Sequence, residues 1–520
     1  MKNKTIKRAL ILLFIGMAVI FTACEVLIPG DAVRKFEKSG LYKIVNGERV
    51  LQEIAGEANL ANALAIIRQD IVKAPTSYVI VLTKDESVTP QYLTPLGDNT
   101  RGNETNGWAK YNFAFKNITV EGLKPVTVKL KPAGDAGTSA KIPLFVVGTY
   151  DKEDAWATRA DKGEIVFTLG ENITLEGSQN NPCPLIGVIA GGRLIIDGAV
   201  ITGNSRLVAS KGGGGVGGGI EILDGGTLTM KGGTISNNSI TISSPSSQDS
   251  PAMTVGGGAI YLGPEGTFIM DGGNITANNV TNEQGYAAGG GILMWDSSFT
   301  MNGGVISENA ASSSSHSTSG GGICLTGSSQ YNLTGGTVSG NKVSSSGASS
   351  MGGGIYVSAE SSFTMTGGVI SGNTALSSDN IAQGGGIFLA GSSQYDLTGG
   401  TVSGNSVSGS EESKGGGIYV ATDEVFTPPP EISITDNTPD DTGSVESNNS
   451  GEEEGEGGED ENEGGESGEN GNESGEGGDS GEGDNESGEG GESGEGDNES
   501  GENDNESGEG DNESGDSGGE

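Results

Sequence analysis

The residues best suited to catalysis in this sequence occupy one position of a repeated segment, directly before a pair of glycines. Clustered carboxylates with a neighbouring basic residue can cleave a polysaccharide by acid–base chemistry. Asp197, Lys231 and Asp271 alternate in sign on successive repeats, as paired charges on neighbouring strands do. The later repeats carry no charge there and place uncharged residues instead: Asn302, Thr334, Thr366 and Thr398. We therefore predict a structural role for this row and assign no catalytic residue.

Other groups that could do chemistry are isolated in the sequence. The single histidine, His316, follows a run of alanines and serines and is predicted to be a solvated loop residue. The glycine-rich run 211–219 lacks the following helix and the Lys-Ser/Thr pair of a phosphate-binding loop, so it is predicted to form turns. Acidic units near the C-terminus lack the ordered spacing of a calcium loop. The sequence thus predicts no metal site and no cofactor.

The cysteines point to export rather than to redox chemistry. Residues 1–23 combine a basic start with an apolar stretch too short to span a bilayer, which predicts a signal peptide. The segment ends Phe-Thr-Ala-Cys, which resembles a bacterial lipobox, so we expect lipidation of Cys24; the alternative is ordinary cleavage near Ala23. Cys183 and Cys324 are separated by about four repeats, too far apart for a disulfide.

The composition limits the class of partner. The chain has 520 residues, 94 glycines and a formal net charge of −42. A balance this acidic argues against nucleic acid and against anionic membrane surfaces as partners. Residues 451–520 contain only Gly, Glu, Asp, Asn and Ser and have nothing to bury, so 438–520 is predicted to be a disordered acidic tail.

Two repeated elements organise the middle of the chain and must position every side chain discussed above. One reads Gly-Gly-Gly-Ile or Gly-Gly-Ala-Ile, ending at Ile220, Ile260, Ile292, Ile323, Ile355, Ile387 and Ile418. The other reads apolar-x-x-Asn, ending at Asn204, Asn238, Asn278, Asn309, Asn341, Asn373, Asn405 and Asn437. Three short alternating runs with turns in each repeat predict one coil of a parallel β-helix, with a serine-rich loop such as 374–383 leaving it. The asparagines are expected to stack as an amide ladder or to take a left-handed turn.

Stacking the repeats in register predicts two uncharged inward ladders. One is Leu194, Leu228, Phe268, Phe299, Tyr331, Phe363 and Tyr395; the other is Ile196, Met230, Met270, Met301, Leu333, Met365 and Leu397. The motifs resemble the polymorphic outer membrane protein repeat of bacterial surface proteins, defined by GGA[ILV] and FxxN. The resemblance covers roughly half the chain and implies a right-handed parallel β-helix at the cell surface. Only residues 257–260 match the first motif letter for letter, and the C-terminal barrel of many members is not expected here.

The predicted domains follow from these patterns. After the signal peptide come an N-terminal linker (24–56), a capping helix with irregular early coils (57–183) and the repeat β-helix (184–437). The capping helix is placed at 57–72 because Leu60, Leu64, Ile67 and Ile71 share one helical face. The expected fold class is therefore all-β, a right-handed parallel β-helix with a short N-terminal capping helix and the acidic tail.

An outward aromatic stripe is the candidate binding site. In each Gly-Gly-Gly-Ile strand the residue after the isoleucine must point away from the core. These residues include Tyr261, Leu293, Tyr356, Phe388 and Tyr419, with Trp295 also outward in its coil. Rings about 4.8 Å apart suit stacking on sugars or on an extended peptide. The alternative is structural: the rings stack on each other, or the serine-rich loops cover them.

The function expected from the sequence is that of a lipid-anchored outer-membrane or cell-surface protein that presents its β-helix for adhesion and is not an enzyme; a periplasm-facing location is the alternative. Its expected partners are the membrane, through the N-terminal lipid anchor, and a glycan or a protein of a host or neighbouring cell. One alternative is a polysaccharide lyase or hydrolase with its site in the early coils around 151–164. The other is an inert spacer or coat component.

Overall fold

A computed structural model describes most of the middle of the chain. Several predicted features lie outside the described residues: the signal peptide, Cys24, the segment 151–163 and all of the tail beyond residue 445. The described ranges are 38–54, 56–70, 74–94, 113, 115–130, 143–148, 164–208, 216–242, 254–283, 285–411, 413–422 and 426–445.

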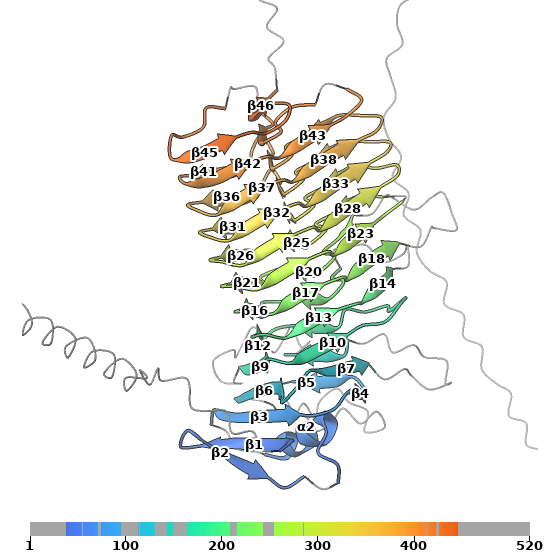
Figure 1. Ribbon diagram of the computed structural model, residues 1–520, viewed down its shortest axis with the longest axis vertical. Helices are drawn as coiled ribbons and strands as arrows, with labels where there is room; N and C mark the ends of the chain where they lie inside the picture. Colours follow the sequence, from blue (N-terminus) through green and yellow to red (C-terminus); the bar gives the residue numbers. More distant parts are fainter. Residues whose placement is uncertain are drawn as a thin grey trace, which may run out of the picture. The chain divides into compact units, whose positions relative to one another are not determined.

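Three long sheets form the walls of a parallel β-helix, and successive coils stack along it (Figure 1). Sheet 1 runs in the order β2 (Glu48–Gln52), β1 (Gly40–Val45), β3 (Thr76–Leu82), β6 (Lys116–Gly122), β9 (Ile165–Leu169), β12 (Gly192–Ile196), β16 (Thr227–Met230), β21 (Thr267–Met270), β26 (Ser298–Met301), β31 (Gln330–Leu333), β36 (Ser362–Met365) and β41 (Gln394–Leu397).

The other two walls follow sheet 1 in each coil. Sheet 2 contains β4 (Glu86–Val88), β7 (Val126–Leu130), β10 (Ile173–Glu176), β13 (Val200–Thr202), β17 (Thr234–Ser236), β22 (Asn274–Thr276), β27 (Val305–Ser307), β32 (Thr337–Ser339), β37 (Val369–Ser371), β42 (Gly400–Ser403) and β45 (Ile432–Thr435). Sheet 3 contains β5 (Gln91–Leu93), β8 (Phe145–Val147), β11 (Ile186–Val188), β15 (Ile220–Ile222), β20 (Ile260–Leu262), β25 (Ile292–Trp295), β30 (Ile323–Thr326), β35 (Ile355–Val357), β40 (Ile387–Leu389), β44 (Ile418–Val420) and β46 (Thr442–Ser444).

The predicted inward ladders are confirmed by the strand register. Phe268, Phe299 and Tyr331 occupy equivalent places in successive strands of sheet 1 and are fully buried. Their rings stack with centroids 4.5 and 4.8 Å apart. The Tyr331 hydroxyl donates to the sulfur of Met301 at 3.4 Å, which gives the buried phenol a partner. The exception is Tyr395 in the last strand of sheet 1, whose ring is 39% exposed.

The serine-rich segments expected to be loops are in fact strands, so that prediction is wrong. They form a side lobe of two further parallel sheets. Sheet 4 contains β14 (Ser205–Val208), β18 (Ser239–Ile242), β23 (Asn279–Thr281), β28 (Ala310–Ser313), β33 (Lys342–Ser345), β38 (Thr374–Ser377) and β43 (Ser406–Ser408). Sheet 5 contains β19 (Val255–Gly256), β24 (Ala287–Ala288), β29 (Thr318–Ser319), β34 (Ser350–Met351) and β39 (Ala382–Gln383).

The side lobe has a narrow core of its own. It is built from small apolar residues that alternate with serines along the strands: Ile240, Val255, Val280, Ala287, Ala311, Val343, Ala375, Ala382 and Val407. Inward serines bond to backbone carbonyls; Ser345 Oγ, for example, donates to the His316 carbonyl at 2.9 Å. A hydroxyl satisfied in this way can be buried at little cost, so a serine-rich sequence forms strands here.

The two repeated motifs meet at the neck that joins the side lobe to the three walls. The asparagines form the expected amide ladder: the backbone N–H of Asn309 donates to Oδ1 of Asn341 at 3.0 Å, and Nδ2 of Asn309 donates to the same oxygen at 3.0 Å. All eight asparagines of the motif are buried. The left-handed turn falls one residue earlier, as at Glu308 with φ 57°.

The glycines are the other half of the neck. In the coil of Ile355, a Cβ on Gly353 would lie 2.4 Å from the carbonyl oxygen of Gly385 and 2.6 Å from the backbone of Thr374. Gly352 has φ +67°, a conformation that favours glycine. The chain entering the lobe and the chain leaving it therefore pass each other at a distance that only glycine permits.

The N-terminal cap differs from its prediction in one respect. Helix α2 (Leu60–Gln69) is confirmed, with Leu60, Leu64 and Ile67 buried and Asn59 Oδ1 accepting from the backbone N–H of Asn62 at 2.9 Å. Ile71 lies outside the described residues. The expected linker at 24–56 instead contains the antiparallel hairpin β1–β2, which extends sheet 1.

The remaining domain limits also differ from those expected. The early coils at 57–183 were expected to be irregular, but β3 to β10 pair in register with the later strands of the same sheets. At the other end, β46 pairs with β44 beyond the predicted limit at residue 437. The stack is therefore longer at both ends than the repeat motifs indicate, because strands continue where the motifs have faded.

Candidate interaction surface

The predicted stripe lies on the outer side of sheet 3, in the register expected. Tyr261 pairs with Leu293, and Tyr356 pairs with Phe388, which pairs with Tyr419. Four of the six residues, Tyr261, Leu293, Phe388 and Tyr419, are buried and do not form an open surface. Tyr356 is half-buried, and Trp295 is 46% exposed.

Both structural alternatives account for this burial. The rings of Tyr356 and Phe388 stack with centroids 5.2 Å apart, and those of Phe388 and Tyr419 with centroids 5.4 Å apart. Lower in the stack, Leu293 and Cys324 form a small apolar cluster with Ala288, a residue of sheet 5. The side lobe therefore covers part of the stripe, and it does so with strands rather than loops.

The protonation of the stripe follows from its burial. Burial raises the pKa of Tyr261 to about 12, and the carboxylates of Glu221 and Asp296 add to the shift. Burial likewise raises the pKa of Tyr356 to about 12, with Cys324 beside it adding to the shift. Burial also raises the pKa of the Cys324 thiol above its ordinary value. A thiol that stays protonated is a poor nucleophile, so we assign Cys324 a packing role.

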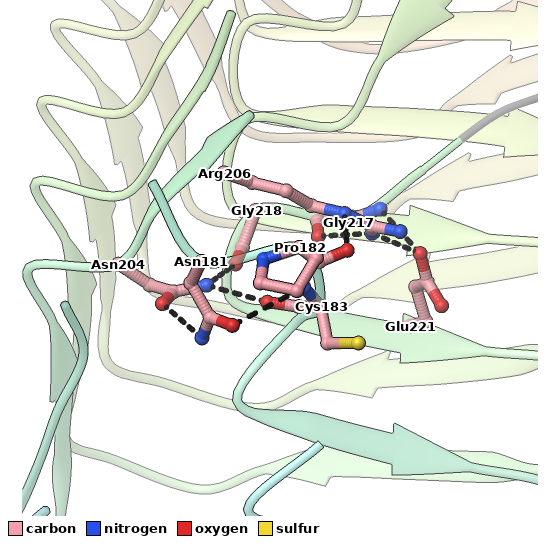
Figure 2. A network of polar contacts seen from close by, with 8 residues as sticks. All are labelled: Asn181, Pro182, Cys183, Asn204, Arg206, Gly217, Gly218 and Glu221. Atoms are coloured by element: carbon pink, nitrogen blue, oxygen red, sulfur yellow. Dashed lines mark hydrogen bonds and ion pairs between the residues drawn. The ribbon is translucent and has the colours of Figure 1, made fainter. Parts of the chain in front are cut away.

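In the coil of β15 the outward position next to Tyr261 is held by Glu221, which belongs to a network of polar contacts (Figure 2). Arg206 forms an ion pair with Glu221, and both side chains are largely buried. The Arg206 guanidinium also donates to the carbonyls of Gly217 at 2.9 Å and Pro182 at 3.1 Å. Glu221 Oε1 accepts from the backbone N–H of Gly217 at 3.2 Å. These hydrogen bonds satisfy the buried charges of Arg206 and Glu221. The pair lies in a coil that precedes β19, the first described strand of sheet 5.

The same network starts the asparagine ladder. Figure 2 shows Nδ2 of Asn181 directed at Oδ1 of Asn204, at 2.8 Å. Asn204 Nδ2 in turn donates to the carbonyls of Cys183 at 3.0 Å and Gly218 at 2.7 Å. Cys183 and Cys324 form no disulfide with each other, as predicted. Asn204, the first asparagine of the ladder, therefore has hydrogen-bond partners in the preceding turn, Asn181 and Cys183.

The candidate acid–base row lies on the surface. Asp197, Lys231 and Asp271 are exposed, and Asn302 Nδ2 donates to Asp271 Oδ1 at 2.8 Å. The Thr334 hydroxyl donates in turn to Asn302 Oδ1 at 2.9 Å, so the hydrogen bonds along this row join Asp271, Asn302 and Thr334. Among the described residues, no three His, Cys, Asp or Glu side chains come together as metal ligands would.

His316 is part of an ordered turn and not of a freely solvated loop. Its ring packs edge-on against Tyr286 with centroids 5.1 Å apart, and Nδ1 lies 2.8 Å from Ser315 Oγ. That hydroxyl also donates to the carbonyl of Glu283 at 2.8 Å. Because the hydroxyl has one hydrogen and the carbonyl can only accept, the histidine must donate from Nδ1. The imidazole therefore does not activate Ser315 as a base would.

The cap contains a buried titratable cluster that the sequence did not indicate. Lys116 is fully buried, with Nζ 3.9 Å from Asp70 Oδ1, and Lys43 Nζ donates to Asp70 Oδ2 at 2.7 Å. The Tyr78 hydroxyl also bonds to Asp70. Burial lowers the pKa of Lys116, while the Asp70 carboxylate opposes that shift. The cluster ties the end of α2 to β1, β3 and β6, which makes it part of the cap.

A regular uncharged surface lies on the outer side of sheet 2 from β13 to β45, and we call it the neutral face. It consists of two rows of outward side chains: Val200, Thr234, Asn274, Val305, Thr337, Val369, Thr401 and Ser433, and Thr202, Ser236, Thr276, Ser307, Ser339, Ser371, Ser403 and Thr435. None is charged, and all except Ser236 are half-buried or exposed. Hydroxyls contact along the rows, as between Thr276 and Ser307 at 3.1 Å.

Comparison with known proteins supports the fold. A family model described as "Right handed beta helix region" matches residues 241–438. The stack is accordingly a right-handed parallel β-helix. No curated protein and no solved structure matches the chain. No helix in the part of the chain that the structure describes is long and apolar enough to cross a membrane.

Proposed function

We propose that this chain is an exported, lipid-anchored protein of the outer membrane or cell surface that binds an extended partner along the neutral face without turning it over. The observation that carries the proposal is that face itself. The chain has a net charge of −42, yet the two outward rows of sheet 2 carry no charged side chain from β13 to β45. Among the described strands, charged residues stand in these rows only before β13, at Lys129 and Glu176. The location at the cell surface is the one implied by the resemblance to the polymorphic outer membrane protein repeat.

The chemistry of the neutral face favours a neutral polysaccharide as the partner. Serine and threonine hydroxyls both donate and accept hydrogen bonds, as sugar hydroxyls do. Valines such as Val305 and Val369 alternate with threonines in one row and offer apolar contact to the faces of sugar rings. Contacts repeat at each coil, about 4.8 Å apart, so many weak contacts add up along a polymer that lies on the face.

A pair of charge insertions tests this face. Ser339→Glu combined with Ser371→Glu places two carboxylates on adjacent coils of the neutral face. Asn332→Glu combined with Thr364→Glu places the same charges on adjacent coils of the outer side of sheet 1 and is the matched control. Binding is measured by co-sedimentation with cellulose and chitin and by affinity electrophoresis in xylan and mannan gels.

We expect the wild-type chain and the sheet 1 variant to bind the same polysaccharide, and the neutral-face variant to lose binding with an unchanged melting temperature. Equal loss in both variants would contradict a specific role for sheet 2. Absence of binding to every glycan would favour the inert spacer. Release of new sugar ends by the wild-type chain would favour the lyase or hydrolase alternative, with a site near 151–164.

The anchor is tested separately in cells. Cys24→Ala is expected to move the protein from the membrane fraction to the soluble fraction, because the thiol that would carry the lipid is removed. A protein that stays in the membrane would indicate that the apolar leader itself is the anchor. Protease treatment of intact cells then decides whether the anchored protein faces outward or into the periplasm.

A further inference from the structure

The C-terminal end of the stack is uneven. Sheet 1 ends at β41, whereas sheets 2 and 3 each continue with one more strand, β45 and β46. Gly400 pairs with Ile432 and Val402 with Ile434, so the next coil is offset by 32 residues. Residues 426–430, Phe-Thr-Pro-Pro-Pro, therefore fall where the next strand of sheet 1 would lie. Prolines cannot donate to the ladder, so this segment passes over β41 without extending the sheet.

The missing strand leaves a pocket. A cavity of about 300 Å³ opens over β41, lined by Tyr395, Asp396, Leu397, Phe426, Thr427 and Pro429. The Tyr395 ring is 39% exposed, although Tyr331 and Phe363 at the same position of the two preceding coils are completely buried. The Phe426 ring meets it nearly at a right angle, 76°, with centroids 5.9 Å apart. Two aromatic walls and a proline thus surround a space over the end of the core.

The pocket also carries one negative charge where the preceding coils are neutral. Asp396 occupies the outward position that Thr300, Asn332 and Thr364 hold in the coils before it. The coil of Tyr331 reads Gln-Tyr-Asn-Leu and that of Tyr395 reads Gln-Tyr-Asp-Leu, so the carboxylate is a single departure from a repeated sequence. Asp396 is exposed, as expected for a charge that remains available to a ligand.

Two aromatic rings at a steep angle, in a pocket whose lining includes an aspartate, suit the recognition of a quaternary ammonium group. The ring faces attract the cation, the methyl groups fill the apolar space, and the carboxylate neutralises the charge. The acidic chain as a whole also raises the local concentration of cations.

We propose that this pocket binds an organic cation with a quaternary ammonium group, of the choline class. The site is independent of the neutral face, and neither proposal depends on the other. Titration calorimetry of the full chain with choline chloride tests it, with 3,3-dimethyl-1-butanol as the uncharged isostere of the same shape. We expect saturable binding of choline and none of the isostere.

Three substitutions separate the parts of the pocket. Asp396→Asn, which restores the sequence of the preceding Tyr coil, is expected to weaken choline binding about tenfold, or about 1.4 kcal/mol. Tyr395→Leu should abolish binding, and Tyr395→Phe should retain it because the ring face remains. Asp379→Asn removes an exposed carboxylate from the side lobe and is the control for net charge; it should leave binding unchanged.

The proposal is overturned by several distinct results. Equal binding of choline and 3,3-dimethyl-1-butanol would mean an apolar site with no preference for charge. Binding of methyl glucoside without choline would assign the pocket to a saccharide. No heat with millimolar choline from a chain whose melting temperature is normal would reject the site. Equal weakening by Asp396→Asn and Asp379→Asn would mean that only the net charge of the chain matters.

Discussion

Replacing one asparagine in the middle of the ladder should destabilise the stack far more than replacing an asparagine on the outer side of a wall. Asn341 is fully buried. Its Oδ1 accepts from the backbone N–H and from Nδ2 of Asn309, each at 3.0 Å. Its Nδ2 donates to Oδ1 of Asn373 at 3.0 Å and to the carbonyl of Ile306 at 2.9 Å. Asn341→Ala removes all four bonds.

The magnitude follows from what remains buried. Each bond contributes about 1 kcal/mol net, and leaving the Asn309 N–H without an acceptor adds a desolvation penalty of about 1–3 kcal/mol. Four bonds and this penalty together give an expected loss of about 5–7 kcal/mol, measured from urea unfolding followed by circular dichroism of the full chain. Asn332→Ala, on the outer side of sheet 1, is the control and should stay within about 0.5 kcal/mol of wild type.

A second substitution at the same place tests the reasoning through pH. Asn341→Asp keeps an acceptor for Asn309 but turns an oxygen toward the Ile306 carbonyl and buries a charge. Burial raises the pKa of such a carboxyl above its unfolded value near 4, so stability is highest below about pH 4 and is lost as the pH rises. The reasoning is refuted if Asn341→Ala matches Asn332→Ala, or if Asn341→Asp is no more stable at pH 4 than at pH 7.

Three further predictions concern the core, the neck and the stripe. Met301→Asp should cost at least about 4 kcal/mol because it buries an unpaired charge, whereas Thr300→Asp beside it on the outer side of sheet 1 should be nearly neutral in thermal melts. Gly353→Ala should lower the melting temperature strongly because its Cβ meets backbone on two sides; Gly354→Ala should be milder. Because burial raises the pKa of Tyr261 to about 12, its contribution to stability is complete below pH 10 and is lost as the pH rises from 10 to 12. Tyr261→Phe should flatten that alkaline loss in urea titrations, and an unchanged slope would show that the phenol is not responsible.

Sequence spacing was enough to predict the three walls. Positions such as Phe299 and Met301 recur at a fixed interval and alternate with polar residues, so a parallel stack is the arrangement that buries all of them. The side lobe could not be recognised in the same way. Its core consists mostly of single Ala and Val residues among serines, as at Ala375, and the buried serine hydroxyls bond to backbone carbonyls, as Ser377 does to that of Ala348.

Other features were missed for different physical reasons. The hairpin β1–β2 turns at Asn46-Gly47, both with positive φ, and an Asn-Gly pair is a sequence signal for such a turn. The outward direction of the stripe was correct, but its burial depends on sheet 5, which the sequence did not predict. The pocket at Tyr395 arises because no described strand of sheet 1 follows β41. The repeat pattern predicts where strands form, so it could not predict a pocket that depends on the absence of one.

The neck explains why the two motifs occur together. The second glycine of each Gly-Gly-Gly-Ile lies against backbone of the chain entering the lobe, as Gly321 lies against Lys342, so no side chain fits. A Cβ on the third glycine would meet the ladder amide and one backbone carbonyl. On Gly322 it would lie 3.0 Å from Asn341 Nδ2 and 2.8 Å from the Gly354 oxygen, which is less crowded than the second position, so exchange to alanine costs less there. The chain itself contains that exchange, because Ala259 occupies the third position and is fully buried. The glycines belong to the chain segment that leaves the lobe and the asparagine to the segment that enters it, and the two motifs contact each other where these segments cross. A repeat that carried a side chain at the second position would have to widen the crossing, and the asparagine bonds on either side of it would lengthen.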